Sequence, residues 1–168
     1  MKKIIYILLI IIILSTYIHS NKVVIPDESI RFRIIPNSND ITDQKTKQSI
    51  KKDLEKELFP KLEKASSIEE SRTIIKENEP LIKETLDKYN IPYTINYGNN
   101  YFPEKEYKGV TYKEGEYESL VITLGEASGN NWWCVMYPPL CLIESQSNNY
   151  EEPEYKFYIE EILSKLTN

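Results

Sequence analysis

Apolar residues recur at every second position in the first mixed segment of the chain. In residues 29–35, SIRFRII, the apolar side chains of Ile30, Phe32 and Ile34 alternate with Arg31 and Arg33. This period of two is typical of a β-strand. The turn-forming sequence Pro-Asn-Ser-Asn-Asp follows directly. The pattern therefore predicts a first strand over residues 29–35.

Helical periodicity replaces this alternation after residue 40. Four apolar residues recur at four-residue steps between lysines and acids, namely Ile50, Leu54, Leu58 and Leu62. We expect Asp40 or Thr42 to cap this helix and Pro60 to kink or end it. A second helix opens at Ser67 and Glu70, which have the spacing of a capping box. Pro80 either breaks this helix or begins a third one.

Strand signals return after Asn90, where Ile91-Pro92 disfavours further helix and YTINY follows. Residues 105–125 predict two strands around a turn at Gly115, with Leu120, Ile122 and Leu124 on one face. A short tryptophan-rich strand comes next. Residues 154–166 predict a final helix with an apolar face.

The order of these elements is strand, two or three helices, three or four strands, then helix. Strands that follow a run of helices favour an α+β fold with the helices packed on one face of a largely antiparallel sheet. We expect a single globular domain over residues 23–168, with its core at about 29–144 and the C-terminal helix at about 154–166.

The first 22 residues have the layout of a secretory signal, with two lysines before an unbroken apolar run from Ile4 to Leu14. Extended to Ile18, the run spans 15 residues, which is short of the roughly 20 that cross a bilayer. We expect a cleaved signal peptide, with an uncleaved anchor formed by residues 4–18 as the alternative. Both interpretations place the remaining chain outside the cytoplasm.

Charge and composition exclude several classes of function. Residues 1–20 hold two of the 21 basic residues and none of the 26 acids, so the rest of the chain has a net charge of −7. Such a surface is a poor ligand for nucleic acid or anionic lipid. The single histidine, His19, lies in the leader, which leaves no imidazole for a catalytic pair or a histidine zinc site. We expect no catalytic residue, no metal and no cofactor.

Residues 124–144 contain both tryptophans, both cysteines and the Pro138-Pro139 pair. In an extended segment Trp132 and Trp133 point to opposite faces, so one of them is a candidate contact residue; the alternative is that both belong to the core.

Cys134 and Cys141 are the only thiols of the chain and lie seven positions apart. In an oxidising compartment they would form a disulfide, and two buried free thiols are the alternative.

Two rival functions rest on other residues. Glu114, Glu116 and Glu118 could supply the acid and base of an enzyme acting on peptidoglycan, although alternate positions on a strand more simply form a solvated face. Six tyrosines could line a carbohydrate-binding surface or pack against the sheet, namely Tyr93, Tyr97, Tyr101, Tyr107, Tyr112 and Tyr117.

Four motifs in the chain resemble the stage II sporulation protein R family of endospore-forming bacteria. They are RFRIIPNSND at residues 31–40, YFP at 101–103, GEYESL at 115–120, and LGE through GNNWWCV to PPLC within 124–141. The resemblance covers about residues 29–144. One departure is Ala127, where the family usually has a second glycine.

The resemblance implies a signalling protein and not an enzyme. Members are secreted from the forespore into the intermembrane space, where they activate a membrane-embedded aspartic protease of the mother-cell membrane. That protease processes the precursor of mother-cell sigma factor E. We expect the tryptophan-rich segment to dock against this protease, with the disulfide of Cys134 and Cys141 stiffening the partner-binding residues, namely Asn131, Trp132, Trp133, Pro138 and Pro139. The alternative role of these residues is that of a core motif alone.

Overall fold

The computed structural model describes residues 4–11, 23–26, 28–107 and 110–141. The predicted C-terminal helix at 154–166 lies outside these ranges. Residues 4–11 form a helix whose apolar side chains are exposed. Within the described ranges, no helix has the length and apolar character needed to cross a membrane.

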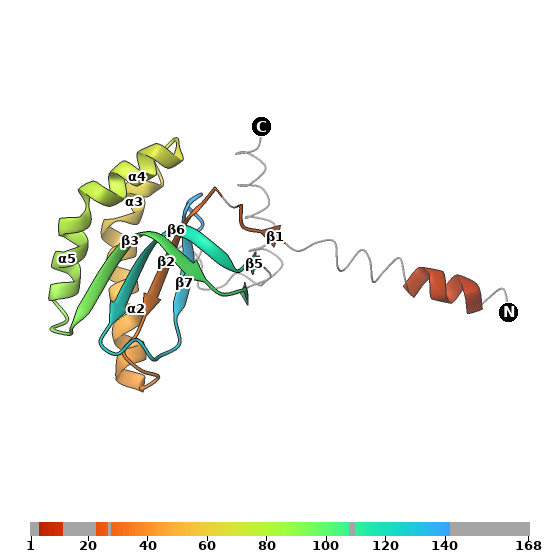
Figure 1. Cartoon of the computed structure of the whole chain (residues 1–168), viewed down its shortest axis with the longest axis horizontal. Helices are drawn as coiled ribbons and strands as arrows, with labels where there is room; N and C mark the ends of the chain where they lie inside the picture. The colour runs from red at the N-terminus through yellow and green to blue at the C-terminus, as the bar shows by residue number, and fades with distance from the viewer. Residues whose placement is uncertain (1–3, 12–22, 27, 108–109, 142–168) are drawn as a thin grey trace.

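A mixed four-stranded sheet forms the centre of the molecule (Figure 1). Its strands are β2 (Ile30–Ile35), β3 (Tyr93–Phe102), β6 (Gly115–Leu124) and β7 (Trp132–Tyr137), in the order β3-β6-β2-β7. Strand β2 runs parallel to β6 and antiparallel to β7, and β3 runs antiparallel to β6. Two of the three pairings are therefore antiparallel, as the order of sequence elements predicts.

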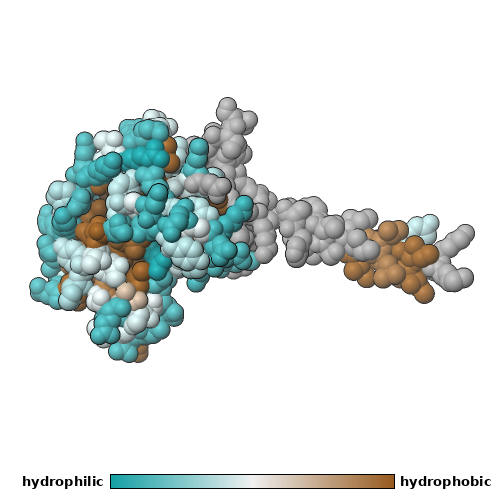
Figure 2. Space-filling view, in the orientation of Figure 1, coloured by the Kyte–Doolittle hydropathy of each residue, from teal (hydrophilic) through white to brown (hydrophobic). Residues whose placement is uncertain are grey.

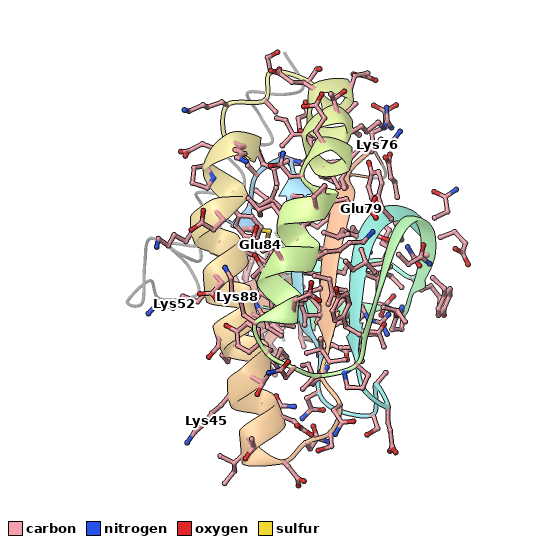
Figure 3. All side chains as sticks on the ribbon, turned by 90° about the vertical axis from the view of Figure 1, so that its left-hand side faces the viewer. Lys45, Lys52, Lys76, Glu79, Glu84 and Lys88 are labelled. Carbon is pink, nitrogen blue, oxygen red and sulfur yellow. A yellow bond between two sulfur atoms is a disulfide. The ribbon has the colours of Figure 1, made fainter. Side chains whose placement is uncertain are left out.

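Four helices cover one face of this sheet, which confirms the α+β class (Figure 1). They are α2 (Ile41–Glu57), α3 (Phe59–Leu62), α4 (Ile68–Glu77) and α5 (Glu79–Asp87). Pro60 and Pro80 both stand in the first turn of a new helix, where the missing N–H costs no hydrogen bond. Figure 3 shows charged side chains of α2 and α5, such as Lys45 and Glu84, pointing away from the sheet.

The helix caps follow the sequence in part. Asp40 occupies the N-cap position of α2, but its side chain makes no capping hydrogen bond. At α4 the Ser67 hydroxyl accepts a hydrogen bond from the Glu70 amide at 3.1 Å. The Glu70 carboxylate accepts from the Ser66 amide at 2.7 Å, and not from the Ser67 amide that a capping box would use.

The main core fills the space between the helices and the sheet. Leu120, Ile122 and Leu124 all point into it, as their alternation predicts. The helices and their α2–α3 junction contribute Ile50, Leu54, Leu58 and Leu62 at the predicted four-residue spacing, and α4 and α5 add Ile75, Ile82 and Leu86.

The predicted hairpin at Gly115 is wrong. Strand β6 pairs with β3 along ten positions, from Tyr93 opposite Leu124 to Phe102 opposite Gly115. Strand β5 (Val110–Tyr112) instead pairs with β4 (Lys105–Tyr107) and with β1 (Val23–Val24) in a separate three-stranded sheet. The ten-pair ladder offers more cross-strand contacts than a short hairpin could, and local turn signals do not encode such a distant partner.

Two loops at one end of the sheet clasp each other. The Pro36–Asp40 turn follows β2, and the 125–130 loop precedes β7. The amides of Ser128 and Gly129 donate to the carbonyls of Asn37 and Pro36 at 3.0 and 3.2 Å. The Asn37 side chain accepts from the Glu126 amide at 2.9 Å. These main-chain bonds fix where β7 begins.

Charged side chains of α2 secure both halves of this clasp. Asp43 accepts hydrogen bonds from Asn37 Nδ2 at 2.8 Å and from Ser38 Oγ at 2.6 Å, and these bonds lower the pKa of its carboxyl. Lys47 is buried and donates from Nζ to the Asn130 carbonyl at 2.7 Å. Burial lowers the pKa of Lys47. One helix thus binds both loops.

The clasp leaves little room for side chains. A Cβ at Gly129 would collide with the carbonyl of Ser38, and one at Gly125 would collide with the Asn37 side chain. Gly125 also has φ of +54°, a left-handed conformation that favours glycine. Ala127 has φ of +57°, which is also in the left-handed region that glycine tolerates best.

We predict that Gly129→Ala lowers the free energy of unfolding by about 2–3 kcal/mol, because the new methyl group forces the two loops apart. Ser128→Ala is the matched control. It removes one exposed hydroxyl bond to the Asn37 carbonyl and should cost about 1 kcal/mol. Denaturant unfolding of both variants, each exported from the full-length sequence, gives the comparison. A loss at Gly129 no larger than that at Ser128 would contradict the close-packed clasp.

Candidate functional site

The two tryptophans lie on opposite faces of strand β7, as the sequence predicts. Trp132 joins the core under the helices, and Trp133 joins a smaller cluster on the other face. Their exposed fractions are 5% and 6%. Neither ring therefore projects into solvent.

Trp132 is packed by an aromatic ring and a lysine. Its ring lies edge to face against Phe32, with centroids 5.2 Å apart. The Lys51 ammonium stands 5.1 Å from the indole centroid, within the range of a cation–π contact. These contacts tie β7 to β2 and to α2, so Trp132 stabilises the helix-covered side of the sheet.

Trp133 supports an arginine on the opposite face. The Arg33 guanidinium lies 4.9 Å from the Trp133 centroid and 5.7 Å from that of Phe102. With its amide oriented to satisfy both groups, Asn131 accepts from Arg33 Nε at 3.1 Å. Arg33 is half-buried, and this burial lowers its pKa. Tyr101, whose carbonyl lies 3.5 Å from Arg33 Nη1, is 56% exposed.

These three residues, Arg33, Asn131 and Trp133, form what we call the Arg33 face, and the Tyr101 carbonyl lies beside it. The sequence motifs contain all three, but of the three, sequence reasoning singled out only Asn131 and Trp133 as binding residues. The missed signal was the pair of arginines on alternate positions of a strand, next to a motif-borne Trp-Trp pair. Stacked, half-desolvated arginine with neighbouring aromatics is the composition of protein-binding hot spots.

Arg31 has a different environment from Arg33, although the two share a face of β2. Its side chain is fully buried. The guanidinium stacks 3.2 Å from the Tyr117 ring centroid, and Nη1 donates to the Lys113 carbonyl at 3.2 Å. Phe102 and Tyr112 complete the aromatic surround at 5.4 and 5.7 Å. Arg31 therefore stabilises the face that presents Arg33.

The predicted disulfide is present. Cys134 and Cys141 are bonded and buried in the main core, with Cα atoms 5.5 Å apart. The bond closes the turn made by Pro138 and Pro139, in which the Leu140 amide donates to the Pro138 carbonyl at 2.7 Å. Pro138 is buried and Pro139 is half-buried. The turn is thus fixed at both ends.

The carboxylates proposed for the rival enzyme do not form an acid–base pair. Glu118 accepts hydrogen bonds from Arg72 at 2.8 Å and from the Tyr97 hydroxyl at 2.6 Å. The Arg72 bond chiefly lowers the pKa of Glu118, whereas a general acid needs a raised pKa. Glu114 and Glu116 are exposed.

The tyrosines proposed for carbohydrate binding do not share one surface. The Tyr93 hydroxyl donates to Asp87 at 2.7 Å on the helix side, where Tyr97 also packs. Tyr112 and Tyr117 are buried around Arg31. The side chain of Tyr107 lies outside the described residues. Among the described residues, moreover, no three histidines, cysteines or acids are grouped so as to hold a metal ion.

We predict that replacing both Cys134 and Cys141 by alanine lowers the free energy of unfolding by about 2.5 kcal/mol, the value expected for a loop of this length. Denaturant unfolding of the exported chain measures the loss. Adding a reductant should move the native chain to the same midpoint and leave the double variant unchanged. A midpoint insensitive to reductant would mean that the bond does not contribute to stability.

A second prediction concerns the ion pair of Glu118 with Arg72. Because its folded-state pKa lies below the ordinary 4.5, Glu118 adds stability above that value and loses it as the pH falls through the lowered pKa. Glu118→Gln should cost about 1 kcal/mol at neutral pH and flatten the acid limb of the stability curve. Unfolding free energies of both chains, measured from neutral to acid pH, test this. If the two curves of unfolding free energy against pH run parallel, the prediction is contradicted.

Known proteins place the chain in a family. The sequence model described as stage II sporulation protein R (spore_II_R) matches residues 26–147. The stage II sporulation protein R of Bacillus subtilis strain 168 is 40% identical over an alignment of 141 residues that covers 80% of this chain and 63% of that protein. The chain thus spans less than two thirds of the length of this relative. No solved structure matches it significantly. The chain belongs to the stage II sporulation protein R family.

Proposed function

We propose that the chain is a secreted signal made by the forespore, which activates a membrane-embedded aspartic protease across the intermembrane space. Activation would lead to processing of the precursor of mother-cell sigma factor E. Family membership supports this assignment. A basic, apolar leader and a domain without internal histidine are consistent with an exported protein that binds and does not catalyse.

The Arg33 face is the surface that we propose for contact with the protease. The observation that carries this proposal is the stacking of a half-buried arginine between Trp133 and Phe102, 4.9 and 5.7 Å away. A guanidinium held in this way has already lost much of its side-chain freedom, so binding it to a carboxylate or carbonyl costs little further entropy. Its partly desolvated charge also gains more from a partner than a solvated one would.

The tryptophan-rich segment then has two roles in the proposed complex. Trp133 holds Arg33 in position and Asn131 orients it, while Trp132 anchors the strand from the core side. The Pro138-Pro139 turn and its disulfide fix the far end of β7. Our expectation that one tryptophan inserts into the protease therefore becomes the proposal that Trp133 supports a contact made by Arg33.

The decisive experiment exports the full-length chain beside the protease and the sigma-factor precursor in a host that lacks all other sporulation proteins. Precursor cleavage that depends on the chain supports the proposed function. We predict that Arg33→Ala reduces the cleavage rate at least about tenfold, the effect of losing a hot-spot residue. Immunoblotting of precursor and product over time measures it.

Lys45→Ala serves as the control, because Lys45 is exposed on α2, on the other side of the molecule. It should leave cleavage unchanged. Equal amounts and equal thermal stability of the exported variants exclude a folding defect. Full activity of a stable Arg33→Ala chain would overturn the Arg33 face while leaving the signalling role intact. No cleavage by the native exported chain would overturn the signalling role itself.

A further inference from the structure

Strand β3 is an edge of the sheet, and its outer side pairs with no other strand among the described residues. It is ten residues long. Its sequence, YTINYGNNYF, contains no charged residue and no proline. Sheet edges are usually protected from further pairing by lysine, proline or a short length. The β3 edge has none of these protections.

The backbone of β3 directs a regular set of hydrogen-bonding groups away from β6. The Gly125 amide donates to the Pro92 carbonyl at 2.8 Å, one position before the pair Tyr93–Leu124. Antiparallel pairing alternates, so even-numbered residues bond to β6 and odd-numbered ones direct N–H and C=O outward. The outward set is Tyr93, Ile95, Tyr97, Asn99 and Tyr101; of these, the Tyr101 carbonyl accepts a hydrogen bond from Arg33 Nη1 at 3.5 Å.

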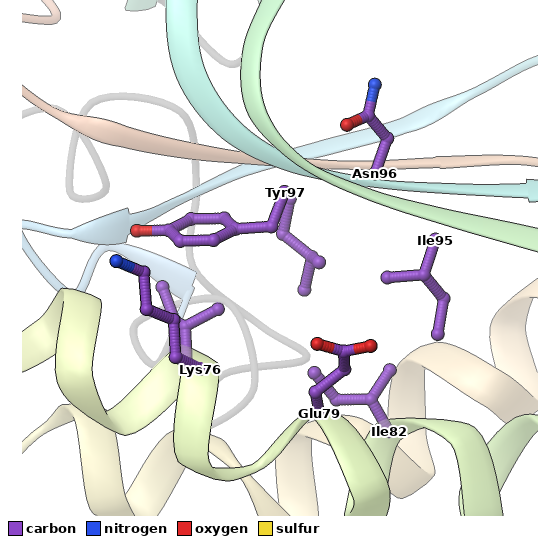
Figure 4. A pocket seen from close by; sticks show the side chains of 8 residues that line it. Lys76, Glu79, Ile82, Ile95, Asn96 and Tyr97 are labelled. Atoms are coloured by element: carbon purple, nitrogen blue, oxygen red, sulfur yellow. The ribbon is translucent and has the colours of Figure 1, made fainter.

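A pocket of mixed polar and apolar lining opens beside this edge, between β3 and the junction of α4 and α5. Its volume is about 380 Å³. Ile75, Ile82, Ile95 and Leu120 supply its apolar lining, and Lys76 and Glu79 also line it (Figure 4). Figure 2 shows apolar surface in the hollow between α5 and β3.

The pocket lies on the side of the β3 edge toward which alternate side chains of the strand point. The side chains of Ile95 and Tyr97 point toward the helices, where they pack against the main core, while Asn96 points away (Figure 4). A strand added beside β3 would direct every second side chain toward the helices as well. One such side chain would lie over the pocket. The geometry is that of a peptide bound by strand addition between a sheet edge and a helix.

We propose that the β3 edge and this pocket bind an extended segment of a partner protein, with a large apolar residue in the pocket and basic residues flanking it. The charge of the chain selects this occupant over a second copy. Residues 21–168 carry a net charge of −7, so two copies repel each other and a neutral or basic segment is favoured. The site lies on the helix side of the sheet, away from the Arg33 face, and does not depend on the proposed function.

The opposite edge of the sheet does not offer the same site. Strand β7 has six residues, and the disulfide-bonded turn folds back against it. Cys141 Sγ lies 3.0 Å from the Val135 carbonyl oxygen. This contact occupies the Val135 carbonyl. The described residues therefore leave β3 as the longer and more accessible edge.

Selection from a phage-displayed library of random linear peptides tests the proposal, with the chain exported from its full-length sequence as bait. We expect the enriched peptides to share an apolar residue with basic neighbours. Bound to the isotopically labelled chain, a selected synthetic peptide should shift the amide signals of Tyr93, Ile95, Tyr97 and Asn99 most strongly. Failure to enrich any peptide, or shifts centred on the Arg33 face, would overturn the proposal.

Asn99→Pro tests the backbone contact directly, because it removes an outward N–H without removing a bond to β6. We predict that the selected peptide binds about tenfold more weakly to this variant, because one backbone hydrogen bond is lost and the strand geometry around it changes. Asn99→Ala keeps the N–H and should bind within about twofold of the native chain.

The amide shift map of the native chain decides the matter if Asn99→Pro does not fold. Equal binding by a folded Asn99→Pro chain would contradict strand addition. Gel filtration completes the test: a native dimer that Asn99→Pro dissociates would assign the edge to a second copy and overturn the proposed partner.

Discussion

Strand β2 is buried on both of its faces, and the rest of the molecule is arranged to meet that constraint. On one face Phe32 and its neighbours pack under the helices. On the other, a fully buried Arg31 must find partners, because an isolated buried charge costs several kcal/mol. The Tyr117 ring and the Lys113 carbonyl provide them. The segment between β3 and β6 therefore brings Tyr112 and Lys113 close to Arg31.

The clasp between the 36–40 turn and the 125–130 loop determines how β7 comes to lie beside β2. Strands β2 and β6 are parallel and end at the same end of the sheet, so the chain must reverse there before β7 runs antiparallel beside β2. Main-chain bonds and the buried Lys47 hold the loop that makes this reversal. Because these contacts bring the two loops close together, they require small residues at the points of contact, as Gly125 and Gly129 show. The two longest sequence motifs meet here, which explains their turn-forming composition.

Local signals predicted much of this structure, and long-range pairing accounts for what they missed. Helix breaks at Pro60 and Pro80, the opposite faces of Trp132 and Trp133 and the disulfide follow from the geometry of a few consecutive residues. The parallel pairing of β2 with β6 does not, because alternation fixes which face a side chain occupies and leaves the neighbouring strand open. For the same reason alternation predicts that Arg31 and Arg33 share a face of β2, but it does not predict the aromatic rings that surround them.

Strand β3 belongs to both surfaces that we propose for binding. Ile95 and Tyr97 line the helix-side pocket, whereas the carbonyl of Tyr101 lies beside Arg33 on the other face. The two sites are six residues apart along one strand, which is about 20 Å. An extended segment of ten residues could therefore pair with the edge and reach Arg33. A partner that contacts both surfaces binds the second at high effective concentration, so two modest contacts on one strand suffice for a tight and specific complex.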